Sequence, residues 1–148
     1  MRARDLAVDF PAVRTDTPVI EAARLLAQQD LPGLIVVDAA GRPSTILPGT
    51  DVLKMAVPQY CQADPALARV VDEAAADVFI HQLGSRTVAQ ALPDRPRELP
   101  LVDDDATALE IAALMARSRS PLVAVVDDDG LLIGAVTLDG LLERVLAP

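Results

Sequence analysis

An internal repeat constrains the fold of this chain more than any other feature of its sequence. Residues 16–53 and 105–142 align without a gap, at an offset of 89 residues that takes residue 16 to residue 105. The matched positions include the identical pairs Glu21/Glu110, Pro32/Pro121, Val36/Val125, Asp38/Asp127, Gly41/Gly130 and Leu53/Leu142. A repeat of this length that is present twice predicts two half-modules that pack face to face, rather than an open array.

Composition narrows the class of protein. The 148 residues are enough for one domain or for two small halves that share a core, and 51% of them are hydrophobic. Aromatic residues make up only 2% and the net charge is −9, so the chain lacks both the stacking surface and the basic face that nucleic acid requires. The basic residues include three scattered pairs, which we interpret as solvated surface: Arg2 and Arg4, Arg95 and Arg97, and Arg117 and Arg119.

The sequence also predicts a compartment. Cys61 is the single cysteine, so no intramolecular disulfide can form and a reducing environment fits. The first ten residues carry charges and no apolar core, and no uncharged run is long enough to span a bilayer. We therefore expect a cytoplasmic protein without membrane insertion.

Each copy of the repeat predicts helix, strand, strand, helix. In the first copy the helix begins at Thr17 and Pro18, which we expect to cap it, and the strands cover residues 34–37 and 44–47. In the second copy the helices cover residues 107–118 and 139–146, and the strands cover residues 122–126 and 131–136. Short strands are expected near Val13 and at residues 101–102, just before each copy.

A segment between the copies is not explained by the repeat. Asp64 and Pro65 have the form of a cap and a first-turn proline, and apolar residues then follow at helical spacing until Gly84. We therefore predict an added helix at residues 64–83, and three regions: a first repeat at 1–58, a connecting helix within 59–84 and a second repeat at 85–148. Residues 86–92 resemble residues 2–7, so each copy has a similar lead-in segment.

This order of elements resembles that of the CBS domain. The resemblance is carried by the lead-in segment, the capped helix, the strand that ends Val-Val-Asp (Val36-Val37-Asp38 and Val125-Val126-Asp127), the glycine turn, the second strand and the helix start related to Thr-x-x-Asp-Leu-Leu. It covers nearly the whole chain. It implies an α/β fold of two β-α-β-β-α repeats packed by pseudo-two-fold symmetry, a tandem pair often called a Bateman module, which commonly forms a homodimer.

The resemblance also implies a ligand. CBS pairs bind adenosine-containing molecules such as AMP, ADP, ATP or S-adenosylmethionine in clefts between the repeats. In the family the Asp of the Thr/Ser-x-x-Asp segment binds the ribose hydroxyls and the hydroxyl residue helps to hold phosphate, because a carboxylate offers two acceptors to a diol and a helix N-terminus attracts anions. By position, the contacts carried over are Asp51, Thr50, Lys54 and the backbone at Leu34 in the first copy, and Thr137, Asp139 and the backbone at Val123 in the second.

Both copies depart from that motif. The first reads Pro48-Gly49-Thr50-Asp51, so the carboxylate is present and proline replaces the hydroxyl residue. The second reads Thr137-Leu138-Asp139-Gly140, so the hydroxyl is present and glycine replaces the carboxylate. We expect Thr50 and Asp139, which stand next to the missing positions, to substitute after a small backbone shift. The alternatives are helix capping by Asp51 and Thr50, and a solvated Lys54.

Other candidate sites have ordinary structural explanations. Asp127-Asp128-Asp129-Gly130 and Asp103-Asp104-Asp105 concentrate carboxylates, but their spacing does not match a calcium loop and an Asp-Gly turn is typical of hairpins. His81 has no second ligand nearby in the sequence, and Cys61 reads as a small packed residue. Because nucleophile, base and metal cluster are all missing from the pattern, we expect neither catalysis nor a bound metal or cofactor.

The expected function is therefore that of a stand-alone CBS-pair regulatory module that binds an adenosine-containing nucleotide and modulates a separate enzyme or transporter. The alternative is a ligand-free dimerisation scaffold whose clefts have degenerated, in which Leu141, Leu142, Val145 and Leu146 serve the dimer. A nucleotide-hydrolysing enzyme is a third, weaker hypothesis.

Overall fold

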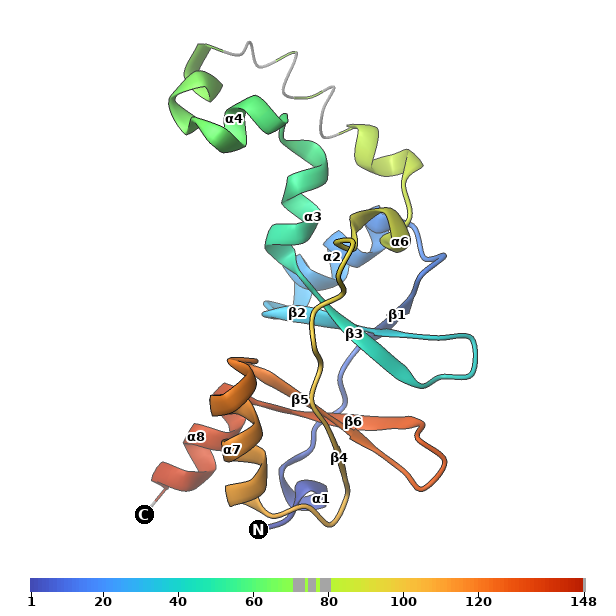
Figure 1. Cartoon of the computed structure of the whole chain (residues 1–148), viewed down its shortest axis with the longest axis vertical. Helices are drawn as coiled ribbons and strands as arrows, with labels where there is room; N and C mark the ends of the chain where they lie inside the picture. The colour runs from blue at the N-terminus through green and yellow to red at the C-terminus, as the bar shows by residue number, and fades with distance from the viewer. Residues whose placement is uncertain (71–73, 75–76, 78–80, 148) are drawn as a thin grey trace. The chain divides into compact units, whose positions relative to one another are not determined.

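The structure is a computed structural model that describes residues 1–147 except 71–73, 75–76 and 78–80 (Figure 1). It has a mixed α/β fold with two three-stranded sheets. The described elements are α1 (Ala3–Leu6), β1 (Ala12–Arg14), α2 (Val19–Gln29), β2 (Gly33–Val37), β3 (Pro43–Pro48), α3 (Gly49–Ala56), α4 (Gln59–Ala63), the 3₁₀-helices η1 (Pro65–Val70) and η2 (Gln82–Ser85), α6 (Val88–Ala91), β4 (Leu101–Asp103), α7 (Ala108–Ser118), β5 (Leu122–Val126), β6 (Leu132–Thr137) and α8 (Leu138–Leu146).

The two sheets repeat one strand order, β1-β2-β3 and β4-β5-β6, which confirms the predicted two-fold repeat. In the second sheet β4 runs parallel to β5, with Val102 opposite Val125. β5 runs antiparallel to β6, with Val123 opposite Val136 and a register shift between Val125 and Val126. The strands expected near residue 13 and at 101–102 are confirmed as β1 and β4.

The chain divides into two compact units: unit 1 contains segments of both copies, and unit 2 contains segments of the first copy and the lead-in segment of the second. Unit 1 comprises residues 1–12, 35–46 and 97–148, and unit 2 comprises residues 13–34 and 47–96. The chain therefore enters each unit more than once. The predicted boundaries of the repeats, at residues 58 and 84, remain a prediction.

The central strand of unit 1, β5, is buried on both faces. Val123 and Val125 pack in one cluster with α1, α7 and α8, which contribute Leu6, Ile111 and Leu141. The alternate residues Leu122 and Ala124 pack in a second cluster with Ile35, Ile46, Leu99 and Ala135. This burial accounts for the uninterrupted apolar run of the strand, because a strand covered on both sides has no solvent-facing positions.

The N-terminal lead-in segment of unit 1 is hydrogen-bonded to the second copy. The N–H of Ala3 donates to the Ala106 carbonyl (2.8 Å), and Val8 and Ala135 exchange two backbone hydrogen bonds of 2.9 and 3.0 Å. Gly134 permits this approach, since a Cβ at that position would lie 3.0 Å from the carbonyl oxygen of Val8. The lead-in segment of copy one thus completes the packing of copy two.

The reciprocal contact occurs in unit 2. The N–H groups of Val88 and Ala89, at the start of α6, donate to the carbonyls of Thr17 and Thr15, each at 2.9 Å. The Val19 N–H donates to the Arg86 carbonyl, also at 2.9 Å. Helices α2, α3 and α6 are in mutual contact in this unit. Sequence analysis identified both lead-in segments but not this exchange, which is a contact between residues far apart in the chain.

One local prediction was wrong, and a second differs from the structure at its start. Thr17 does not cap α2: the N-cap is Pro18, and the Thr17 hydroxyl instead accepts the Arg14 N–H at 3.0 Å. The start of the predicted helix at 64–83 is the 3₁₀-helix η1, whose side chains are all outside the core. Two of the apolar residues at helical spacing in that predicted helix, Val71 and Val78, lie outside the described residues.

Candidate functional site

The start of helix α3 carries the first set of candidate residues. β3 runs directly into this helix, whose N-cap is Pro48 in extended conformation. Proline has neither a side-chain acceptor nor an N–H, so neither arm of a capping box can form, and no side-chain hydrogen bond caps the helix. The alternative in which Asp51 or Thr50 acts as the N-cap is therefore wrong.

Asp51 is a buried carboxylate on the first turn of α3. Its residue is 3% exposed, whereas Thr50 beside it is exposed. The Asp51 Oδ1 lies 3.8 Å from the Nζ of Lys54, whose side chain is 63% exposed. Burial of a carboxylate is unfavourable unless partners compensate for lost water. Asp51 is thus a buried acid at a helix start, with a solvated cation one turn on.

The matched helix start, that of α8, is built differently. Thr137 is its N-cap, and the Thr137 hydroxyl accepts the Gly140 N–H at 3.0 Å. Asp139 is exposed on the first turn. The structure therefore places Thr137 as a cap, so that its hydroxyl is already engaged with the helix backbone.

The remaining candidates, Leu34 and Val123, lie at matched places in β2 and β5. Both residues are 0% exposed, main chain included. Leu34 belongs to unit 2 together with Thr50, Asp51 and Lys54. Val123 belongs to unit 1 together with Thr137 and Asp139. The roles of these residues toward a ligand stay predictions.

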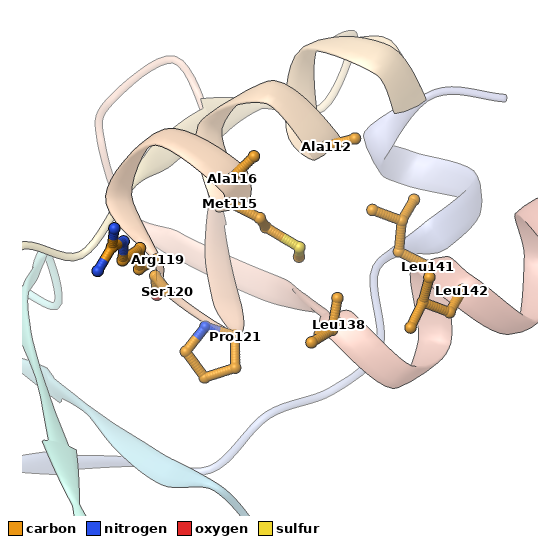
Figure 2. A pocket seen from close by; sticks show the side chains of 9 residues that line it. All are labelled: Ala112, Met115, Ala116, Arg119, Ser120, Pro121, Leu138, Leu141 and Leu142. Atoms are coloured by element: carbon orange, nitrogen blue, oxygen red, sulfur yellow. The ribbon is translucent and has the colours of Figure 1, made fainter.

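Sequence analysis missed an apolar hollow on unit 1. It lies between α7 and α8 and has a volume of about 600 Å³. Figure 2 shows the side chains of Met115, Leu138 and Leu142 gathered around it, while the guanidinium of Arg119 points away from them. The lining residues are Ala112, Met115, Ala116, Arg119, Ser120, Pro121, Leu138, Leu141 and Leu142. The helical spacing of the apolar residues in α8 indicated one side of this surface. It did not indicate that α7 forms the other side.

Of the four residues expected to serve a dimer, one is buried and three are exposed. Leu141 is 4% exposed and belongs to the core of unit 1, because it packs with the second copy's strands. Leu142, Val145 and Leu146 are 45, 57 and 76% exposed. The outer face of α8 is therefore strongly apolar.

The acidic turn at residues 127–130 is a hairpin turn between β5 and β6, as predicted. The Asp127 carboxylate accepts the N–H groups of Asp129 and Leu131, at 2.9 and 3.0 Å. Asp38, its counterpart in the first copy, accepts the N–H groups of Arg42 and Ala40. The Arg42 N–H, followed by that of Ala40, holds the pKa of the Asp38 carboxyl below its ordinary value. Among the described residues, no group of three or more His, Cys, Asp or Glu side chains is arranged to hold a metal ion.

Other charged and reactive residues have structural roles. Arg2 and Arg4 are exposed, as predicted, and both contact Asp105: Arg4 forms an ion pair of 3.0 Å with its carboxylate and Arg2 donates to its carbonyl at 3.0 Å. Cys61 is buried, as predicted. His81 is exposed, and its Nδ1 lies 3.1 Å from the carbonyl oxygen of Asp77. In the part of the chain that the structure describes, no helix combines the length and apolar character needed to cross a membrane.

Comparisons with known proteins identify the repeat. The CBS domain family matches residues 3–57 and 95–147. A crystal structure of a CBS domain-containing protein of unknown function from Kribbella flavida is 49% identical, with 99% of each chain covered and a TM-score of 0.91. CBSX2 of Arabidopsis thaliana, solved in complex with AMP, is 22% identical, with a TM-score of 0.68 over 98% of this chain and 96% of that one. The CBS domain of a membrane protein from Sphaerobacter thermophilus is 23% identical, with a TM-score of 0.73 over 100% and 90%. No curated protein matches the chain.

Proposed function

We propose that this chain, which belongs to the CBS domain family as a tandem pair, is a regulatory module that binds an adenosine-containing nucleotide and modulates a separate partner enzyme or transporter. The family, together with an AMP complex of a protein of the same fold, supports a nucleotide ligand. AMP, ADP, ATP and S-adenosylmethionine share the adenosine group that such a site recognises. The proposed role is regulatory and not catalytic.

The observation that carries this proposal is the burial of Asp51 at the start of α3. A 3% exposed carboxylate beside a helix N-terminus suits a ligand that brings both hydroxyls and negative charge. We assign Asp51 to the ribose hydroxyls, and Thr50 and Lys54 to the phosphate. The backbone at Leu34 flanks the adenine in this assignment. Thr137, Asp139 and Val123 stand at the corresponding positions of the second copy, and we assign no ligand contact to them.

Regulation then follows from a shift between conformations. The ligand favours the conformation that it binds more tightly, and a partner protein responds only as far as it prefers that same conformation. The partner is a separate protein in this proposal.

A thermal-shift panel tests ligand binding. A ligand present at 100 times its Kd raises the free energy of unfolding by about 2.7 kcal/mol, so at least one of AMP, ADP, ATP, NAD and S-adenosylmethionine should raise the Tm. Asp51→Asn should remove that rise, whereas Asp128→Asn, which changes an exposed carboxylate of the β5–β6 turn, should keep it. Absence of any shift at millimolar concentration would contradict nucleotide binding.

The apolar hollow on unit 1 favours a second candidate function, a ligand-free dimerisation scaffold. We propose that a second copy of this chain covers α7 and α8. On α8 the acidic Asp139 stands near the start and the basic Arg144 near the end, and α7 carries Glu110 and Arg117 in the same order. Two copies that pair these helices antiparallel bring opposite charges together around the apolar stripe.

The mass in solution tests this surface. Size-exclusion chromatography with light scattering should give twice the mass of the chain for the wild type. Leu142→Arg places a charge in the hollow and should shift the mass to that of the monomer. Ile133→Arg alters a side chain of similar exposure on β6, outside the hollow, and should leave the dimer intact. A monomeric wild type would contradict the scaffold hypothesis.

A further inference from the structure

The two matched helix starts differ in chemistry at two positions that a nucleotide would contact. At the offset of the repeat, Asp51 of α3 corresponds to Gly140 of α8, and Lys54 corresponds to Glu143. The first helix start therefore has a buried acceptor for a diol and a cation for a phosphate. The second has no side chain at the first position and a carboxylate at the other.

The backbone of α8 is also closed at this point. The Gly140 N–H, one of the donors that a bound anion would need, is taken by the Thr137 hydroxyl at 3.0 Å. A Cβ at Gly140 would lie 3.0 Å from that same oxygen, so the cap and a side chain compete for one space. Asp139 is exposed and lies on the same first turn as the cap.

The presence of a side-chain cap does not by itself distinguish the start of α8 from the start of α3. Helix α7 of the second copy is likewise capped by Thr107, which accepts the Glu110 N–H at 3.1 Å, and α2 of the first copy begins on Pro18 without a side-chain cap. The presence of a cap is therefore a property of the whole second copy. What singles out the start of α8 is the loss of the carboxylate together with the acidic replacement of the lysine.

We infer that each chain binds one nucleotide, held by the first copy, and that the start of α8 is closed to it. This inference rests on the proposed nucleotide-binding function. The charges support it, because Asp139 stabilises the positive end of α8 and both Asp139 and Glu143 repel a phosphate, whereas Lys54 attracts one. Leu138, Leu141 and Leu142 of the same helix line the apolar hollow, so α8 is left to serve that surface.

Isothermal titration of the full chain with AMP tests the stoichiometry. We expect one equivalent per chain, and a loss of affinity of about tenfold or more in Asp51→Asn, because a charge-assisted hydrogen bond is removed. Thr137→Val should lower the Tm through loss of the cap and should leave the affinity for AMP within about twofold. Thr137→Ser retains the hydroxyl and should keep both Tm and affinity.

Three results would overturn the inference. Two equivalents of AMP per chain would show that α8 also binds, and so would a Thr137→Val protein that is folded by circular dichroism but binds AMP about tenfold more weakly. Both results leave the proposed function intact. If the wild type binds none of AMP, ADP and ATP, the proposed function fails together with the inference.

Discussion

Substitution of Gly134 by alanine should detach the N-terminal lead-in segment from the second sheet. A Cβ at this position would lie 3.0 Å from the carbonyl oxygen of Val8 and 3.4 Å from the Cβ of Ala7. The closer atom belongs to the backbone, so it cannot move aside as a flexible side chain does. The two hydrogen bonds between Val8 and Ala135 must therefore lengthen or break.

The magnitude follows from the bonds that are lost. Two backbone hydrogen bonds contribute about 2 kcal/mol net, at about 1 kcal/mol each. Replacement of a strand glycine by alanine raises the free energy of unfolding by about 0.5–1 kcal/mol, because the unfolded chain loses conformational freedom. The overpacking caused by the added Cβ lowers it by about 1–3 kcal/mol. We expect Gly134→Ala to lower the free energy of unfolding by about 2–4 kcal/mol, or the Tm by roughly 4–16 °C for a domain of this size.

Thermal and urea unfolding of Gly134→Ala measure this loss, and Gly84→Ala is the matched control. No atom lies within 4 Å of a Cβ at Gly84, so that substitution should leave stability unchanged or slightly raised. Hydrogen exchange should show faster exchange at the Val8 and Ala135 amides in the Gly134 variant. Equal stability of the two variants would refute the reasoning that Gly134 is required for the close approach of Val8.

Two further predictions concern a helix cap and a hairpin carboxylate. Thr107→Ala removes a cap whose hydroxyl accepts the Glu110 N–H, and should cost about 1 kcal/mol in urea unfolding. Thr17→Ala should cost less, since the Thr17 hydroxyl accepts an N–H within a turn and caps no helix, and an equal loss would count against the cap as the cause. The folded-state pKa of Asp38 is lowered by the N–H groups of Arg42 and Ala40, so its contribution to stability is present above the unfolded-state pKa and is lost as pH falls through the folded-state pKa. The difference in urea midpoint between the wild type and Asp38→Asn should therefore shrink below the unfolded-state pKa, and a difference that is constant with pH would contradict this assignment.

The sequence predicted those parts of the fold that depend on local pattern. The strand β5 and the turns at Gly41 and Gly130 follow from an apolar run and from a residue that tolerates positive φ, and both glycines have φ above +80°. The start of α2 could not be predicted in this way. Thr17 is a good cap by type, but the helix begins one residue later, on Pro18, because the Val19 N–H is taken by the Arg86 carbonyl from a distant segment.

The candidate site was predicted by residue type and not by environment. The sequence names Asp51 and Lys54, but their spacing is equally that of a surface ion pair on a helix. Only the structure shows that one member is buried and the other is solvated. The hollow between α7 and α8 could not be predicted from the sequence for a related reason. Two helices line it, and the apolar pattern of each helix does not show which of its faces lies against the other helix.

The exchange of lead-in segments explains why this repeat acts as a pair. An isolated second copy would leave the main-chain groups of Ala135 and the Ala106 carbonyl without the partners that the N-terminal segment provides. An isolated first copy would lose the donors of Val88 and Ala89 to the carbonyls of Thr17 and Thr15. Unpaired backbone groups in partly buried strands and helix ends are costly, so each copy depends on the other for its stability. In the function proposed above, one helix start of the pair carries the ligand contacts, and the matched start has Gly140 and Glu143 in place of Asp51 and Lys54.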